Sequence, residues 1–190
     1  MSERTIGADE AGRGPLAGPV VAAAVILSDA QRDELLKKGL ADSKRVSAPR
    51  REALFRLMND LGVRWAAQAA SPERIDSMNI LRASLWAMGQ SVRKIARDGD
   101  CVLVDGPYEI PGLSLEQQAI PHGDALVPDI SAASIVAKVL RDRVMVRLDR
   151  IFPGYGLAGH KGYPTAAHYD AIARLGPSAI HRRSFRLFRP

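Results

Sequence analysis

The chain has 190 residues, of which 46% are hydrophobic and 25% charged, and its net charge is +6 with a sequence pI near 9.8. These values suit a globular protein of one domain, or of one domain with a small appendage. No apolar run approaches the roughly 18 residues that would span a membrane, and the single Cys101 excludes an internal disulfide framework and a cysteine zinc site.

Two adjacent strands open the chain, and helices follow them. Ser28-Asp29 is typical of a helix N-cap, and Ser47 with Pro49 indicates the start of a second helix. The expected strands of this half cover residues 4–9, 20–27 and 63–70. The expected helices cover residues 30–38, 48–61, a short segment from 71, and one long segment over 78–97.

The second half begins with two short strands and then becomes helical. A glycine turn follows each strand, at Asp105-Gly106-Pro107 and at His122-Gly123-Asp124. The expected strands cover residues 101–104 and 115–120, and the expected helices cover 128–152 and 165–175, separated by a glycine-rich loop. This order predicts a mixed α/β sandwich with a helical final third and no linker between independent domains.

The positive charge is concentrated towards the C-terminus. Residues 150–190 hold seven Lys/Arg against one acid, Asp170. A basic end indicates a polyanionic partner, most often nucleic acid, although solvated surface charge is the plainer interpretation. The N-terminal residues show no signal peptide, so we expect a cytoplasmic protein without a membrane partner.

Four carboxylates stand where expected strands turn: Asp9, Glu10, Asp105 and Asp124. Neighbouring residues on a strand point to opposite faces, so Asp9 and Glu10 can reach one ion only at a strand end, where glycines allow a turn. An all-oxygen set suits Mg²⁺ or Mn²⁺, and two such ions would serve phosphoryl transfer. For Asp9-Glu10 alone, an acidic turn capped by glycine is the plainer interpretation.

The remaining acids and the histidines carry weaker signals. We favour surface or N-terminal helix charge for three acids of the 128–152 helix: Asp129, Asp142 and Asp149. His122 could assist the carboxylates or cap its turn. No histidine pair has metal-ligand spacing, and we expect His168 and His181 to be structural or exposed.

Basic loop residues could fix a scissile phosphate. The candidates are Arg13, Lys44 and Lys161, each of which could equally be a solvated loop charge. Tyr163, on the basic loop that begins at His160, could stack on a sugar or base, or it could pack into the core.

Three competing motifs are weaker. Residues 7–14 imitate a phosphate-binding P-loop, but its Lys is absent and a strand follows rather than a helix. Gly12-x-Gly14-x-x-Ala17 matches a loose dinucleotide fingerprint, and this motif too should open a helix. Ser43 and Ser134 have no evident His–Asp partners for nucleophilic catalysis.

In combination and in this order, several motifs resemble bacterial ribonuclease HII over nearly the whole chain. The motifs are Asp9-Glu10-Ala11-Gly12-Arg13-Gly14-Pro15, Asp42-Ser43-Lys44, Asp105-Gly106, Gly123-Asp124 with residues 130–138, His160-Lys161-Gly162-Tyr163 and His181-Arg182-Arg183-Ser184-Phe185. Each motif alone is moderately specific, and the set is highly specific.

The resemblance implies a ribonuclease H-like fold: a five-stranded mixed sheet flanked by helices, with a catalytic core over about 1–152 and a C-terminal helical extension over about 153–190. It implies a monomeric, Mg²⁺- or Mn²⁺-dependent endonuclease that cleaves the RNA strand of RNA–DNA hybrids. It also implies incision 5′ of a single ribonucleotide in duplex DNA, leaving 3′-hydroxyl and 5′-phosphate ends, as in ribonucleotide excision repair.

The resemblance also implies roles for individual residues. The catalytic and metal-binding carboxylates are Asp9, Glu10, Asp105 and Asp124. Gly12-Arg13-Gly14 senses the ribose 2′-hydroxyl and grips the backbone at the RNA–DNA junction, Tyr163 packs against the adjoining deoxyribose, and Lys44 contacts the backbone. The physical logic agrees, because only the 2′-hydroxyl distinguishes RNA from DNA at one nucleotide.

One departure from the family and two alternative functions matter. His122 replaces the usual Lys, which makes that cation pH-dependent. The alternatives are a catalytically silent nucleic-acid-binding protein of the same fold and another two-metal nuclease, such as a Holliday-junction resolvase. The intact carboxylates and the Gly-Arg-Gly segment argue against both. Binding of a replication partner by Phe185-Arg186-Leu187-Phe188 is left open.

Overall fold

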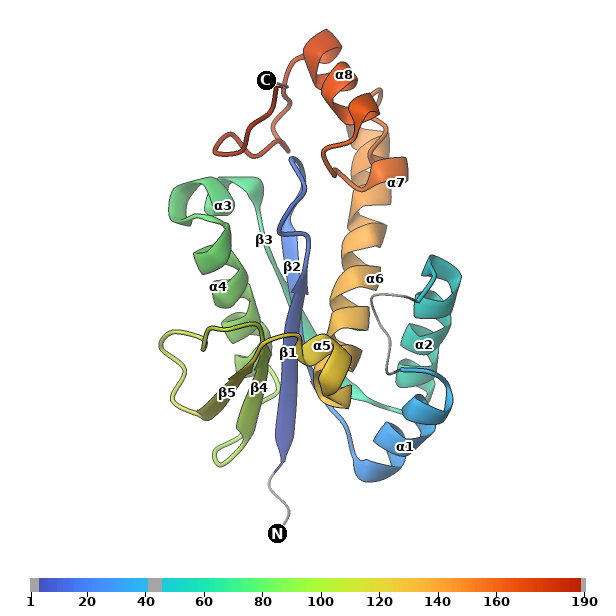
Figure 1. Cartoon of the computed structure of the whole chain (residues 1–190), viewed down its shortest axis with the longest axis vertical. Coiled ribbons are helices and arrows are strands. Elements are labelled where there is room, and N and C mark those ends of the chain that lie inside the picture. Colours follow the sequence, from blue (N-terminus) through green and yellow to red (C-terminus); the bar gives the residue numbers. More distant parts are fainter. Residues whose placement is uncertain (1–3, 41–45, 189–190) are drawn as a thin grey trace.

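A computed structural model describes residues 4–40 and 46–188, and it contains one five-stranded sheet with helices on both faces (Figure 1). The strands are β1 Thr5–Ala11, β2 Val20–Ile26, β3 Arg64–Ala70, β4 Cys101–Asp105 and β5 Glu116–Ile120. Across the sheet their order is β3-β2-β1-β4-β5. β2 runs antiparallel to β1 and β3, whereas β4 is parallel to β1 and β5, so the sheet is mixed as predicted.

The helices cover the sheet from two sides. They are α1 Asp29–Lys37, α2 Ala48–Asp60, α3 Pro72–Met78, α4 Ile80–Arg93, α5 Gly123–Leu126, α6 Pro128–Ile151, α7 Leu157–His160 and α8 Ala166–Leu175. In Figure 1, α4 lies on one face of the sheet and α6 on the other. Strand β2, next to the central strand β1, is buried at every position, because Ala22 and Ala24 join the cluster under α4 while Ala23 and Val25 join the cluster under α6.

The two helices expected from residue 71 and over 78–97 are confirmed as α3 and α4, although α4 is shorter than expected, at Ile80–Arg93. Asn79 lies between α3 and α4 with φ of 70°, and its side-chain oxygen accepts the Arg82 N–H at 3.0 Å. Asn tolerates this left-handed backbone region better than most residues, so one residue ends the first helix and caps the second. Short helices α5 and α7 also occupy segments where a turn and a loop were expected.

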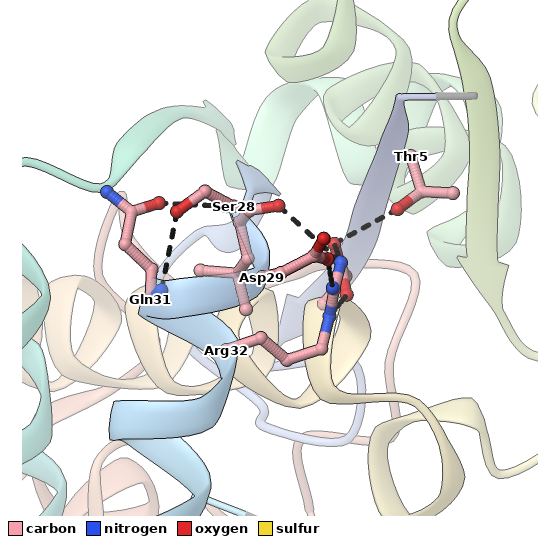
Figure 2. A network of polar contacts seen from close by, with 7 residues as sticks. Thr5, Ser28, Asp29, Gln31 and Arg32 are labelled. Atoms are coloured by element: carbon pink, nitrogen blue, oxygen red, sulfur yellow. Dashed lines mark hydrogen bonds and ion pairs between the residues drawn. The ribbon is translucent and has the colours of Figure 1, made fainter. Parts of the chain in front are cut away.

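The start of α6 is tied to α1 and β1 by a buried carboxylate. Asp129 is only 2% exposed and lies in the first turn of α6, so of its two favoured interpretations the N-terminal helix charge is right and the surface charge is wrong. Its oxygens accept hydrogen bonds from Arg32 Nε at 3.1 Å and from Thr5 Oγ1 at 3.2 Å. Figure 2 shows this corner, where Ser28 and Gln31 form a capping box at the start of α1. The network orients α6 along β1.

The C-terminal third packs on the far end of α6. In Figure 1, α7, α8 and the following segment gather beyond the sheet, around a third apolar cluster. This cluster includes Leu16 from the segment after β1, Met145 from α6 and Ile172 from α8. The segment after β1 is therefore held between the sheet and the C-terminal helices.

The longest described helix, α6, has 24 residues. Among residues 4–40 and 46–188, no helix combines the length and the apolar character needed to cross a membrane.

Candidate active site

The sheet brings Asp9 and Asp105 together. The last parallel pair between β1 and β4 is Ala8 opposite Val104, so the next residue on each strand, Asp9 and Asp105, stands beside the other. The sequence predicts that the first strand ends at Asp9. Its pairing with β4 does end next to Asp9, but its pairing with β2 continues through Ala11, so the strand itself is longer than predicted.

Asp9 sits in a crowded negative field. Its side chain is 4% exposed, and it accepts hydrogen bonds from the Ser134 side chain of α6 and from the Glu10 N–H, the latter at 2.6 Å. Burial, followed by the charges of Glu10 and Asp105, raises the pKa of Asp9 well above its usual range. A cation placed among these carboxylates would offset their repulsion.

Asp124 joins the group through the backbone. It is 1% exposed in the first turn of α5, and its N–H donates to Asp105 Oδ1 at 3.1 Å. His122, just before α5, is exposed, adopts φ of 58° and makes no side-chain capping hydrogen bond, so it does not cap this turn. The turn places Asp124 at the carboxyl end of β4.

Within residues 4–40 and 46–188, no three His, Cys, Asp or Glu side chains are already arranged to hold a metal ion. The donors at this sheet edge are nonetheless carboxylate oxygens, which are the ligands that Mg²⁺ and Mn²⁺ take. The charges of Glu10 and Asp105 both act on Asp9. The donor set therefore fits a divalent cation, whose coordination would require rotations of these neighbouring side chains.

Glu10 connects the carboxylates to the glycine-flanked arginine. It follows Asp9 on β1, and after burial its charge is the next cause of the raised pKa of Asp9. Its Oε1 lies 3.5 Å from Arg13 Nη1, and the Glu10 side chain is 9% exposed while that of Arg13 is 48% exposed. Arg13 is thus tethered at the site yet open to a ligand.

Gly12 cannot carry a side chain in this structure. It adopts φ of +102°, and a Cβ atom at this position would lie 1.9 Å from Arg141 Nε. Glycine is required for both the backbone conformation and the space. Gly14 is less constrained, since a Cβ there would have Tyr163 Cε1 as its nearest neighbour, at 3.8 Å.

Tyr163 lies beside Gly14 and presents its ring to solvent. The residue is 40% exposed, which argues against the core-packing interpretation. Lys138 Nζ and Arg141 Cζ each lie 5.9 Å from the ring centroid. The ring therefore forms an exposed, flat surface with cations at its border.

The two candidate lysines have different outcomes. Lys44 lies outside the described residues. Lys161 donates its Nζ hydrogen bond to the Ala158 carbonyl oxygen. It lines a groove of about 390 Å³ between α2 and α6, together with Arg51, Arg143, Arg147 and Arg150. Lys161 thus belongs to a basic groove rather than to the carboxylate group.

The sequence analysis did not identify the buried side chains that support the Gly12–Gly14 segment and the Tyr163 ring. Arg141 and Arg182 are both 0% exposed, and burial lowers the pKa of each, that of Arg182 to about 9. His168 and His181 are structural and buried, at 0% and 2% exposure. No sequence signal distinguishes these arginines, because arginine is ordinarily a surface residue.

Comparison with known proteins gives a consistent set of matches. A family model described as ribonuclease HII matches residues 6–188. A ribonuclease HII of Moorella thermoacetica is 51% identical over 183 residues, which are 96% of this chain and 86% of the relative. A ribonuclease HII of Laribacter hongkongensis is 52% identical over 186 residues, which are 97% of this chain and 92% of the relative.

Solved structures share the fold. The structure of a PCNA:RNase HII complex from Archaeoglobus fulgidus matches with a TM-score of 0.82 and 29% identity, covering 98% of this chain and 97% of that one. A Bst-RNase HIII in complex with Mn²⁺ matches with a TM-score of 0.77 and 16% identity, covering 98% and 68%. The architecture is therefore the ribonuclease H-like fold that the motifs imply.

Proposed function

Since this chain belongs to the ribonuclease HII family, an endonuclease family that acts on RNA–DNA hybrids, we propose that it also nicks duplex DNA 5′ of a single embedded ribonucleotide. Both cuts would be hydrolyses that leave 3′-hydroxyl and 5′-phosphate ends. One observation carries the proposal. Asp9 stands beside Asp105 of β4, and it lies on the strand β1 that leads directly into the Gly12 turn and towards the exposed Tyr163 ring.

In this proposal the carboxylates hold the divalent ions and fix the position of the cut. The four that would hold divalent ions, Mg²⁺ or Mn²⁺, are Asp9, Glu10, Asp105 and Asp124. When bound, a pair of such ions supplies an activated water and neutralises charge on the leaving oxygen. The chain itself fixes where the cut falls, because Ser134 and the Glu10 N–H hold the Asp9 carboxylate in one orientation.

The segment after β1 would recognise the sugar. Gly12 and Gly14 have no side chains, so the main chain of this segment would approach a 2′-hydroxyl where a side chain would clash. The exposed Gly14 would offer its backbone groups directly, since the Gly12 carbonyl oxygen already accepts a hydrogen bond from Arg182. Arg13, which is half exposed, would contact the adjoining phosphate. The Tyr163 ring would pack against the neighbouring deoxyribose.

Basic residues away from the cut would hold the duplex backbone. Lys161 and the arginines of the groove between α2 and α6 supply positive charge in one place, and Lys44 remains a predicted backbone contact. Binding through phosphates releases counterions, so affinity should fall as salt rises.

The test is a duplex with one embedded ribonucleotide, compared with the same duplex made only of DNA and with an all-DNA four-way junction. We expect Mg²⁺-dependent nicking on the 5′ side of the ribonucleotide and no cutting of the two DNA substrates. The Asp9→Asn chain, purified in parallel, controls for contaminating nucleases. Binding without nicking would favour the silent nucleic-acid-binding protein, and equal cutting of the junction would favour a resolvase.

The proposal extends to assembly and location. We expect a monomer in the cytoplasm, to be checked by sedimentation and by fractionation of cells. The A. fulgidus structure is a complex with PCNA, and a replication partner for this chain would meet its C-terminal segment at Phe188. Phe188 is 57% exposed, whereas Leu187 is buried in the third cluster. Phe188→Ala should therefore abolish co-elution with a PCNA-type clamp.

A further inference from the structure

Arg182 holds the segment that follows β1 by its carbonyl oxygens. Its Nε donates to Gly18 O at 3.0 Å, its Nη1 to Arg13 O at 2.9 Å and its Nη2 to Gly12 O at 2.7 Å. The planar fork of a guanidinium can serve three acceptors at fixed angles. Because Arg182 is completely buried, these bonds fix the path of the Gly12–Gly14 segment from behind.

The preceding residue, His181, reaches Tyr163 through a second histidine. His181 Nε2 lies 3.2 Å from His168 Nε2, and His168 Nδ1 lies 3.0 Å from the Tyr163 carbonyl oxygen. At the other end of the chain of contacts, the Ser178 N–H donates to His181 Nδ1 at 3.0 Å. One continuous line of contacts therefore runs from Ser178 to the main chain of Tyr163.

The contacts assign the proton positions in this line. His181 Nδ1 accepts from Ser178, so its ring proton is on Nε2 and is donated to His168. His168 accepts on Nε2, so its own proton is on Nδ1 and is donated to the Tyr163 carbonyl. Each neutral ring thus donates once and accepts once, and the line has a single direction that ends at Tyr163.

Main-chain bonds join the same three segments. Arg182 N–H donates to Leu16 O at 2.8 Å, Gly18 N–H donates to Ile180 O at 2.8 Å, and Leu16 N–H donates to Gly162 O at 2.8 Å. The segment after β1 is therefore bonded to the tail on one side and to the Tyr163 loop on the other. A Cβ on Gly162 would lie 2.6 Å from Ala17 O, so this contact is close.

From these contacts we infer that the dipeptide His181-Arg182 is a positioning element that sets the register of Tyr163 against Gly12–Gly14. Neither side chain touches substrate in this account. The inference deepens the proposed function and rests on it, because a single ribonucleotide offers one register for cleavage. A continuous RNA strand offers many, so an enzyme with displaced loops can still cut it.

The first test replaces Arg182 with Lys, which keeps the charge but cannot reach three carbonyls. The matched control is Arg183→Lys at the adjacent exposed position. The readout is kcat/KM for a duplex with one ribonucleotide divided by kcat/KM for an all-RNA strand in a hybrid. We expect this ratio to fall by roughly tenfold in R182K, since a misplacement of about 1 Å can cost up to 10²-fold, and to stay unchanged in R183K.

The second test uses two replacements of His181 that divide its hydrogen bonds. His181→Asn keeps an acceptor for the Ser178 N–H but loses the donor to His168, whereas His181→Gln keeps a donor near the Nε2 position. We expect the ratio to fall in H181N and to be largely retained in H181Q. This pair stays informative even where R182K folds poorly.

A loss of activity that affects both substrates equally, accompanied by a lower melting temperature, would overturn the inference and leave only a structural role. Equal ratios in H181N and H181Q would likewise remove His181 from the positioning element. A wild-type chain that cuts hybrids but not single ribonucleotides would reject the proposed function itself, and this result is distinguishable from the others because it needs no variant.

Discussion

Asp9 lies beside Asp105 because Ala8 and Val104 form the last parallel pair between β1 and β4. The relationship is set by the backbone, since a shift of one residue would send one of the carboxylates to the opposite face of the sheet. It also has an electrostatic consequence, as the charge of Asp105 helps to raise the pKa of Asp9. The two residues should therefore act as a unit.

Asp9→Asn and Asp105→Asn should each abolish nicking while leaving duplex binding intact. Asn keeps the size and part of the hydrogen bonding but removes the charge that a divalent ion needs. We expect a loss of at least roughly 10²-fold in rate, by analogy with the removal of one electrostatic stabiliser. Nicking and gel-shift assays measure the two properties, with Asp149→Asn on α6 as the charge-matched control. Retained nicking by either variant would contradict the metal assignment.

Gly12→Ala should be far more damaging than Gly14→Ala. At Gly12 the new Cβ meets the buried Arg141 side chain at 1.9 Å, and the backbone has φ of +102°. A side chain in this backbone region costs about 1–3 kcal/mol, before any displacement of Arg141. At Gly14 the nearest atom is an ordinary contact at 3.8 Å. Urea unfolding of both variants measures the difference, and equal free energies of unfolding would show that Arg141 yields.

Much of the fold could be predicted from local signals, each of which depends on a few neighbouring residues. The fully buried Val20–Ile26 strand, the Ser28 cap and the Pro128 start of α6 are all local signals, and the structure confirms them. The boundary between α3 and α4 was also predicted to within two residues, whereas the end of α4 at Arg93 rather than at residue 97 was not.

The site divides in the same way. Asp9 and Asp105 could be predicted as candidates because each stands at the end of an expected strand, and Asp124 because it lies in the glycine turn after the next one. The buried residues that support the neighbouring Gly12–Gly14 segment could not be predicted. Arg182 meets Gly12 and Gly18 from the far end of the chain, and a buried arginine has the same local sequence as an exposed one. His168 and His181 have no metal-ligand spacing, so only the fold brings their rings together.

Tyr163→Ala should weaken cleavage at isolated ribonucleotides, whereas Tyr163→Phe should preserve it. The ring is 40% exposed and bordered by Lys138 and Arg141, so we expect its face, rather than its hydroxyl, to meet the sugar. Stacking of this kind is worth about 1–3 kcal/mol, or roughly 5- to 150-fold. The measurement is the single-turnover rate on a duplex with one ribonucleotide and on an all-RNA strand in a hybrid. An unchanged rate in the Ala variant would return Tyr163 to a packing role.

Acid should destabilise the protein through the histidine line. Burial and the neighbouring His168 lower the pKa of His181 to about 4 in the folded chain, against an ordinary value of 6.5. Protonation would add a proton at His181 Nδ1, where it would face the Ser178 N–H that this nitrogen accepts. The groups packed around the pair of rings are His160, whose ring stacks on His168 at 4.4 Å, and Tyr155, whose ring lies 4.9 Å from that of His181.

The sign of the effect follows from proton counting. Between pH values of about 6.5 and 4, the unfolded chain binds a proton at His181 that the folded chain does not, so the free energy of unfolding falls as the pH falls. Asp9 works in the opposite direction, because its raised pKa lets the folded chain bind the extra proton.

Comparison of the wild type with His181→Gln isolates the contribution of His181 to this pH dependence, since both proteins keep Asp9. Urea unfolding at several pH values should show the wild type losing roughly 1–3 kcal/mol more than the variant on acidification. Parallel losses in the two proteins would mean that His181 already carries its proton in the fold, and the proton positions assigned between Ser178 and Tyr163 would then be wrong.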